Sequence, residues 1–562
     1  MPLSTARFVP WLLILITVSV WGVAVTHDFA PVDDVMTIAQ NPKLNPPRFT
    51  SDGVLWYWTH PYMGLYVPVT YTAWGLIAKA TWVPTPDKHG QFLRGSVFHA
   101  ASVLAHCISV LAVYAILRQL TLRMWPAVAG ALLFAVHPLQ VETLAWASGL
   151  KDVMSGGFSL VAIWLYLRAV SQKGISSISL STSEVMHGRD AHATLLPKFY
   201  LWSVASLLMA MLCKPSAMVT PLLAAVLDYF ILRRSARQVV RSIAPWLLII
   251  VPLALLAKMV QPGSGVASPP LWERPIIAGG SLAFYLGKLL LPIGLTFDYG
   301  WEPLVMLRKN WFWGSAMVMV AMGVGLWLTR KRLPFMGAAG LVSVAALFPV
   351  LGFVPFMFQS YSTVADHYAY LAMLGPAMVV ARRLSNLPSK QWRFATVACA
   401  IGLMVLAGLT IRQLQFWRNP ETLLRRMIAV KPNSLTGHNG LGKLYESRHD
   451  FTHAEQEYRL LIALNPMYLP ARENLVNVCR YTGHAEEAIN QVHILMKLLS
   501  LQKGSNPEAY RDAFFQLGQI TLTQGLTADA VRYFQEDLRL HPNHVEGRIA
   551  LQQAEQKLKS GK

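Results

Sequence analysis

The first three quarters of the chain alternate between long apolar runs and short polar stretches. An apolar run of about 20 residues can cross a bilayer as a helix, which satisfies its own backbone hydrogen bonds. Residues 1–418 are therefore predicted to form an all-α, polytopic membrane helix bundle. The runs predict about eleven spans, at residues 9–26, 94–118, 126–147, 152–169, 197–213, 215–232, 242–260, 310–329, 334–356, 367–383 and 392–414.

The basic residues between these runs indicate the orientation of the bundle. Cytoplasmic loops of membrane proteins carry an excess of Lys and Arg. With eleven spans all four basic clusters fall on one side, which is therefore predicted to be cytoplasmic and to hold the N-terminus. The clusters are Arg118/Arg123, Arg233/Arg234/Arg237/Arg241, Arg330/Lys331/Arg332 and Arg382/Arg383/Arg393.

Two further apolar stretches, 62–82 and 275–293, do not fit as spans, because either one alone would invert every later loop. We expect both to lie in the outer interface, within outer loops 27–93 and 261–309. The first is rich in Trp and Tyr, which gather at membrane surfaces. The polar segment 170–196 is expected to be a cytoplasmic loop.

From Asn419 the apolar runs end and a period of 34 residues begins. This period is typical of tetratricopeptide repeats, in which stacked helix pairs form an α-solenoid. Residues 419–562 are predicted to form such an array, with an insertion before Pro507 and a capping helix from Asn543 to Lys559. Small and large residues recur at matching offsets, at Leu441, Gly442, Ala454 and Tyr458 and again at Leu517, Gly518, Ala530 and Phe534.

Composition and charge agree with this division. The chain is 54% hydrophobic and 14% charged, whereas soluble domains carry about 25% charged residues. Its net charge of +20 divides into +18 before Asn419 (32 Lys and Arg against 14 Asp and Glu) and +2 after it (17 against 15). No clustered basic surface indicates nucleic-acid binding. The four cysteines form no CxxC pair, so we expect neither a disulfide framework nor a zinc site.

The stretch HPLQVETLAWASGLKD, residues 137–152, places four ionisable groups at a membrane boundary: His137, Glu142, Lys151 and Asp152. Such groups are costly near a bilayer and usually have a function. The alternative is a solvated hairpin tip between two spans. The residues alone leave both interpretations open.

The first outer loop carries a second candidate, the adjacent carboxylates Asp33 and Asp34. Such a pair can act as a general base or bind a metal, and Asp is also a common helix cap. Several cations share the predicted outer face and could neutralise a lipid phosphate, although each could equally extend to lipid headgroups. These are Lys151, Lys214, Lys288 and His367.

Other chemistries find little support in the sequence. His99 and His106 lie seven residues apart on one predicted helix, and we interpret them as core histidines in preference to metal ligands. The chain contains no HExxH, no GxSxG and no Gly-rich phosphate loop. No metal site and no cofactor are therefore predicted, and a requirement for a divalent metal is left open.

Short sequence motifs in the membrane part occur in a distinctive order. The Asp33-Asp34 pair is followed by YVPVTYT, FHAASVLAHC, HPLQVETLAWASGLKD, CKPSAMVTPLLAAVLDYF, YLGKLLLPIGLTFDYGW and ADHYAYL, with the repeats last. In this order they resemble the bacterial branch of the TMTC-type transmembrane-and-tetratricopeptide proteins over nearly the whole chain. The resemblance implies a GT-C glycosyltransferase fold, similar to that of protein O-mannosyltransferases.

The resemblance also implies roles for individual residues. Asp33 takes the position of the acidic base, with Asp34 beside it. Three arginines that the family often has are replaced here by Leu150, His367 and Val67. We therefore expect Lys151, Lys214 or Lys288 to bind the phosphate of the donor instead. The remaining family positions are matched by His137, Glu142, Asp152, Asp228 and Asp366.

The predicted function is that of an inverting glycosyltransferase of the bacterial inner membrane. It would move a sugar from a polyprenyl-phosphate donor to a hydroxyl acceptor, a protein Ser or Thr, on the periplasmic side, where the repeats hold the acceptor polypeptide. Two alternatives are a non-catalytic tetratricopeptide scaffold for envelope assembly and a carrier of lipid-linked sugar. The sequence does not name the sugar, the donor lipid, the acceptor protein or the oligomeric state.

The orientation gives the first testable prediction. A reporter enzyme that is active only in the periplasm, fused after Lys562, should be active in cells, because eleven spans place the repeats outside. The same reporter fused within 170–196 should be inactive and serves as the control. Activity in the opposite pattern would overturn the orientation and the placing of Asp33 on the outer face.

Overall fold

The computed structural model describes a helical protein without β-strands in its described residues, which confirms the all-α prediction. Two compact units, Met1–Leu423 and Leu424–Lys562, make up the chain. The sequence pattern placed the corresponding boundary after residue 418. The described residues are 3–47, 49–86, 91–178, 189–261, 269–329, 332–501 and 507–560.

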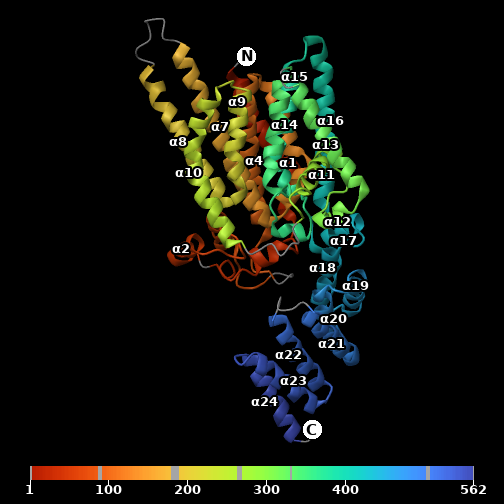
Figure 1. Cartoon of the computed structure of the whole chain (residues 1–562). Coiled ribbons are helices and arrows are strands. Elements are labelled where there is room, and N and C mark those ends of the chain that lie inside the picture. Colours follow the sequence, from red (N-terminus) through yellow and green to blue (C-terminus); the bar gives the residue numbers. More distant parts are fainter. Residues whose placement is uncertain are drawn as a thin grey trace. The chain divides into compact units, whose positions relative to one another are not determined.

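The first unit is a bundle whose long helices run side by side (Figure 1). These helices are α1 (Leu3–Trp21), α4 (Gly95–Thr121), α5 (Met124–Val136), α7 (Leu150–Ile178), α8 (Arg189–Cys213), α9 (Thr220–Phe230), α10 (Ala236–Val260), α11 (Arg274–Leu290), α13 (Asn310–Thr329), α14 (Pro334–Leu347), α15 (Leu374–Ser385) and α16 (Ser389–Gln415). Shorter helices lie between them, namely α2 (Ser51–Thr59), α3 (Pro68–Thr81), α6 (Val141–Ala145) and α12 (Pro303–Leu307).

The expected spans correspond to helices of unequal length. Five described helices are long and apolar enough to cross a membrane, and a pair bent by 49°, Met124–Val136 with Pro138–Ala145, makes a sixth if it counts as one span. Three expected spans fall on shorter apolar helices, Pro197–Cys213, Pro215–Phe230 and Pro334–Val350. The expected span 367–383 is a continuous α-helix only from Leu374, because 3₁₀ turns precede it.

Glycines allow the helices of the bundle to approach closely. A Cβ atom at Gly130 of α5 would overlap the carbonyl oxygen of Ala377 on α15. A Cβ atom at Gly375 of α15 would overlap Ser343 and the carbonyl of Ala339 on α14. Small residues at such crossings are typical of helices packed within membranes. They fix α15, and with it the segment that precedes α15, against the rest of the bundle.

The two ends of the bundle differ in charge. Helices α4, α9 and α15 start at the end that holds the first outer loop, so Arg118, Arg234 and Arg382, at or just beyond their C-termini, lie at the opposite end. The chain leaves this unit at the end that holds the first outer loop. There the Asp28 amide donates to the Arg418 carbonyl over 3.1 Å. Arg330 and Lys331, and most of the expected insertion before Pro507, lie outside the described residues.

The two apolar stretches that were not assigned as spans form helices packed on the bundle. The first forms α3, whose Tyr71 and Trp74 are buried in a cluster with Phe98 of α4 and Leu150 of α7. Trp58, in contrast, is exposed. The second stretch forms α11, which packs on α13. Part of the aromatic belt expected at the interface therefore serves as the core under the outer loop.

The second unit consists of stacked helical hairpins, which confirms the tetratricopeptide pattern. Gly442 of α18 lies against the ring of Tyr458 on α19, and Gly518 lies in the same way against Phe534. The helices that follow α17 (Pro420–Val430) are α18 (Leu435–Ser447), α19 (Phe451–Leu464), α20 (Leu469–Thr482), α21 (Ala485–Leu501), α22 (Pro507–Thr523), α23 (Thr527–Leu540) and the capping helix α24 (Val545–Lys559).

The close approach at Gly442 gives a prediction about the repeats. Gly442→Leu should lower the free energy of unfolding of the array by about 1–3 kcal/mol, because the added side chain cannot fit against Tyr458. Limited proteolysis and thermal melting of the full chain measure the effect. Ser447→Leu, at an exposed position of the same helix, is the control. Equal stability of both variants would contradict this account of the packing.

Candidate active site

Segments far apart in the sequence meet at the end of the bundle that holds the first outer loop. Salt bridges and hydrogen bonds join the loop after α1, the stretch 137–152, the turn after α8, the loop after α11 and the segment before α15. The sequence-predicted residues Asp33, Asp34, Glu142, Lys151, Asp152, Lys214, Asp366 and His367 all take part.

Asp34 is a fully buried carboxylate that accepts backbone hydrogen bonds from two segments. Its oxygens accept from the amides of Ala30 at 2.9 Å, Ala147 at 3.1 Å and Ser148 at 2.6 Å. Burial raises its pKa to about 6, and the N–H donors oppose this rise. With its acceptor sites engaged by the backbone, Asp34 attaches the first outer loop to the turn just before α7.

Asp33 has a different environment. Its side chain is 45% exposed, and one oxygen lies 3.8 Å from Nζ of Lys151, whose own side chain is 9% exposed. The Lys151 ammonium also lies 5.1 Å from the centre of the Trp146 ring. Of the two adjacent acids, only Asp33 can therefore meet a substrate hydroxyl, since Asp34 is enclosed.

Asp152 and Lys214 form the second ion pair of the site, between the start of α7 and the turn after α8. Only Oδ1 of Asp152 takes part, and its buried Oδ2 has no hydrogen-bond partner in the described part of the chain. The Lys214 ammonium also lies 5.9 Å from the ring centre of Tyr368. A buried carboxylate oxygen without a donor is costly, so this atom is available to accept a hydrogen bond from a polar ligand.

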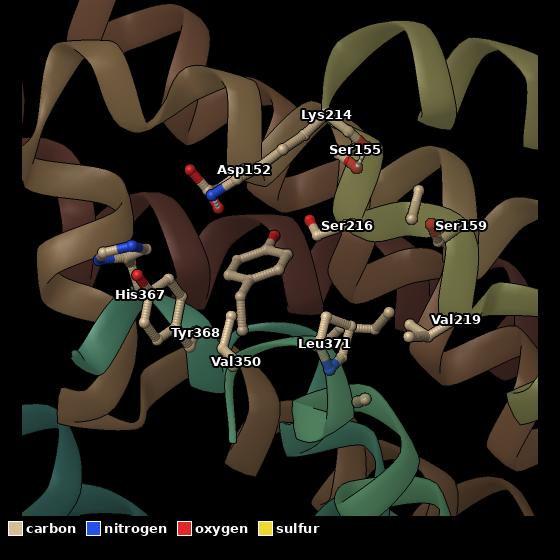
Figure 2. A pocket seen from close by; sticks show the side chains of 15 residues that line it. Asp152, Ser155, Ser159, Lys214, Ser216, Val219, Val350, His367, Tyr368 and Leu371 are labelled. Carbon is tan, nitrogen blue, oxygen red and sulfur yellow. Dashed lines mark hydrogen bonds and ion pairs between the residues drawn. The ribbon is translucent and has the colours of Figure 1, made fainter. Parts of the chain in front are cut away.

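A cavity of about 70 Å³ opens beside this ion pair. In Figure 2, Asp152 and Lys214 meet at one edge of the cavity, with the hydroxyls of Ser155 and Ser216 close to Lys214. The remaining wall comes from the segment around Tyr368 and the end of α14. Most of the lining is apolar, with Val219, Val350 and Leu371 among its residues. Its ion pair and serine hydroxyls can form hydrogen bonds with a polar, uncharged group such as a sugar.

Glu142 and His367 join the stretch 137–152 to the segment before α15. Nδ1 of His367 lies 2.6 Å from Oε1 of Glu142, and Oε2 accepts from the Asp366 amide at 2.8 Å. Tyr299 donates its hydroxyl to Asp366 over 2.8 Å. Burial and the charge of Glu142 raise the pKa of Asp366 well above its usual range, so the charged form is disfavoured. This group of residues supports the site and leaves His367 already paired.

His137 and Lys288 also have partners within the protein. His137 receives the Leu139 amide on Nδ1, and its Nε2 lies 3.1 Å from the Leu289 carbonyl at the end of α11. The Lys288 ammonium donates to the carbonyl of Ile293 over 2.7 Å. Both side chains therefore fix the end of α11. Neither His137 nor Lys288 lines the cavity beside Asp152.

Three other residues that the sequence singled out lie apart from the cavity. Asp228 pairs with Arg234 over 2.8 Å and accepts the hydroxyl of Tyr166, at the basic end of the bundle. His99 and His106 are buried and lie near backbone carbonyls, as predicted for core histidines. No group of three or more possible metal ligands occurs among the described residues.

Sequence reasoning missed several residues of the site, namely Ser155, Ser216 and Tyr368, which line the cavity, and Tyr299, which donates to Asp366. Tyr299 and Tyr368 lie inside quoted motifs, GLTFDYGW and ADHYAYL, but were not selected because an aromatic ring there has many structural explanations. Ser155 is one helical turn after Asp152, and Ser216 is two residues after Lys214. Their spacing from two charged candidates was the available signal.

Comparison with known proteins gives the relatives of this chain. No family model matches it. The human protein O-mannosyl-transferase TMTC1 is 23% identical over 522 residues, with 81% of this chain and 55% of that protein covered. Protein O-mannosyl-transferase F38B6.6 of Caenorhabditis elegans is 21% identical over 484 residues, with 81% and 63% covered. The Drosophila melanogaster Tmtc1 protein is 22% identical over 458 residues, with 67% and 53% covered.

The chain spans between about half and about two thirds of the length of these curated relatives. Among solved structures, a chain of the APC/C hetero-tetramer Cut9–Hcn1 matches at 13% identity with a TM-score of 0.22, covering 76% of this chain and 90% of that one. Such a score does not indicate a shared overall fold. The resemblance expected from the motifs is nevertheless confirmed by the relatives: over about four fifths of its length, this chain is similar to the TMTC-type protein O-mannosyltransferases.

Proposed function

We propose that this protein is a GT-C-type glycosyltransferase that moves a sugar from a polyprenyl-phosphate donor to a Ser or Thr hydroxyl of a polypeptide. The observation that carries the proposal is the Asp33–Lys151 pair, an exposed carboxylate held beside a nearly buried ammonium. Lys151 directly precedes Asp152, which lines the neighbouring cavity. The relatives that match most of the chain are named protein O-mannosyltransferases, which supports the same reaction.

In the proposed reaction Asp33 is the general base. The acceptor oxygen attacks the anomeric carbon while its proton passes to the Asp33 carboxylate. The bond between that carbon and the phosphate oxygen breaks, and the phosphate leaves with the electron pair. One displacement inverts the configuration at the anomeric carbon. Asp34 has no place in proton transfer, because its oxygens already accept three backbone N–H groups.

The two lysines of the site are proposed to have separate tasks. Lys151 is 3.8 Å from Asp33, a loose pairing. When Asp33 accepts a proton it loses its charge, so the Lys151 charge becomes available as negative charge develops on the departing phosphate. Lys214 is engaged by Asp152 and fixes the cavity wall. His367 and Lys288, expected as further phosphate partners, have their own protein contacts and are assigned a supporting role.

Two features support placing the reaction on the outer face of the bacterial inner membrane. The basic residues Arg118, Arg234 and Arg382 lie at the end opposite Asp33, as expected if that opposite end is cytoplasmic. The chain leaves the membrane unit at the Asp33 end. The repeats and the proposed site would therefore share the periplasm, where the repeats would hold the acceptor polypeptide. The donor lipid is the substrate, and no resident cofactor is proposed.

Replacement of Asp33 tests the general base. Asp33→Asn keeps the size of the side chain but removes the proton acceptor, so transfer should fall by about 10²- to 10⁴-fold. The measurement is mannose transfer from polyprenyl-phosphate mannose to a Ser/Thr peptide, with the purified full chain in proteoliposomes. Asp52→Asn, at an exposed acid of α2, is the matched control. Full activity of Asp33→Asn would remove the catalytic assignment and favour the scaffold alternative.

Replacement of Asp34 should give a different result. An Asn amide cannot accept all three backbone N–H groups and places its own N–H among them. Hydrogen bonds to charged groups contribute about 1.5–3 kcal/mol each, so Asp34→Asn should lower the thermal stability of the protein along with its activity. Asp33→Asn should lower the melting temperature less, because the half-exposed Asp33 carboxylate makes only a loose pairing with Lys151, over 3.8 Å. A stable, fully active Asp34→Asn protein would contradict the role assigned to this buried carboxylate.

A further inference from the structure

A second cavity, much larger than the one beside Asp152, lies between four helices of the membrane unit. It has a volume of about 660 Å³ and is formed by α3, α4, α7 and α8; we call it the apolar groove. Its wall is almost entirely apolar. The hydroxyl of Ser206, one of the few polar groups in the wall, donates to the Phe158 carbonyl over 2.8 Å. The groove therefore suits a hydrocarbon chain and not a polar molecule.

The apolar groove follows α7 inward from the end of the bundle that holds the first outer loop. It extends from Leu150 to Leu165, which is about 22 Å of helix. The hydrocarbon of one leaflet is about 15 Å thick, half of the bilayer core. Leu104, Ile108 and Trp202 belong to the wall and are more than half exposed. The groove is therefore open to the lipid and matches the length of one acyl chain with its interfacial end.

The apolar groove and the cavity beside Asp152 lie on opposite faces of α7. Asp152 and Ser159 line the cavity, whereas Gly157 and Val161 line the groove. At about 3.6 residues per turn these two sets point in opposite directions. A donor whose sugar occupies the cavity would have to pass around α7 to place its tail in the groove. The groove is therefore separate from the proposed sugar site.

Two exposed cations lie at the outer end of the apolar groove. Lys79 is two residues after Ile77, which lines the groove on α3, and Arg94 directly precedes α4. The Val83 amide donates to the Phe92 carbonyl over 2.9 Å, which brings together the two segments that carry these cations. Neither cation forms a salt bridge with an acid within the described part of the chain. Their charges complement a phosphate group.

We propose that the apolar groove holds one acyl chain of an anionic phospholipid, with the lipid phosphate at Lys79 and Arg94. A headgroup with its own positive charge fits less well, because it would be repelled by the two cations. The lipid belongs to the leaflet and is not a substrate, so the proposal goes beyond the transfer reaction. It fills the space against the face of α7 opposite Asp152. The lipid therefore supports the helix whose first turn carries Lys151 and Asp152.

Native mass spectrometry of the full chain in detergent tests the proposal by counting bound lipids. The purified chain is delipidated and then titrated with phosphatidylglycerol, phosphatidylcholine or polyprenyl phosphate. We expect one phosphatidylglycerol per chain, bound about tenfold more tightly than phosphatidylcholine with the same acyl chains. Polyprenyl phosphate should not displace it. No transfer reaction is measured, so failure of this proposal is distinguishable from failure of the proposed function.

A bulky side chain in the wall tests the place of the acyl chain. Ala205 is an exposed lining residue on α8, so the indole of Ala205→Trp fills the groove without entering the core. This variant should lose the bound phosphatidylglycerol. Leu248→Trp, at a position of α10 that is 77% exposed and outside the groove, is the matched control and should keep it.

Removal of the two cations tests the place of the phosphate. Lys79→Gln with Arg94→Gln should weaken binding of phosphatidylglycerol by about tenfold and bring it close to that of phosphatidylcholine. The matched control is Arg308→Gln with Lys309→Gln, which removes the same charge from exposed positions just before α13. The control should bind as the unchanged protein does.

Three results would each overturn the proposal. They are full retention of phosphatidylglycerol by Ala205→Trp, equal affinity of the unchanged protein for the two phospholipids, and displacement of phosphatidylglycerol by polyprenyl phosphate. The last result would assign the apolar groove to the donor tail instead. The comparison of lipids uses the unaltered protein, so the proposal stays falsifiable even if a variant folds poorly.

Discussion

The carboxylate of Asp34 holds together two of the segments from which the candidate site is built, the first outer loop and the turn before α7. It is completely buried, and its oxygens accept backbone amides from its own loop and from the turn before α7. This arrangement fixes Asp33, the preceding residue, on the exposed side of the loop and opposite Lys151. A carboxylate in such a position would be too costly to bury without donors. The site therefore depends on one acid that is buried and unreactive.

The ionisable groups around this carboxylate occur in pairs. Asp33 pairs with Lys151, Asp152 with Lys214 and Glu142 with His367. Pairing lowers the cost of placing ionisable groups at the end of a membrane bundle. It also decides which group can react, since the Asp33–Lys151 pair is the longest of the three and includes the most exposed acid. In the proposed reaction this pair separates when Asp33 takes a proton, so that Lys151 can then interact with the departing phosphate.

Much of the architecture was predictable, because apolar length, the positions of Lys and Arg and the 34-residue period each reflect a local constraint. The bundle, the repeats and the core histidines follow from such patterns. The division of work between Asp33 and Asp34 was not predictable, since it depends on backbone amides more than 110 residues away. The different roles of Lys151 and Lys288 were not predictable for the same reason, because they depend on contacts between distant or irregular segments. Both lysines were expected on the outer face, and only the contacts of the Lys288 ammonium show that it fixes the end of α11.

The central claim is that Asp33 and Lys151 face the reacting end of a lipid-linked sugar. Its most direct test is a cryo-electron microscopy structure of the full chain in a lipid nanodisc with polyprenyl-phosphate mannose. The account predicts the donor phosphate against the Lys151 ammonium, the sugar towards the cavity beside Asp152, and the anomeric carbon one hydroxyl group away from Asp33. A donor phosphate bound elsewhere, with Asp33 still paired to Lys151 and remote from the sugar, would contradict it.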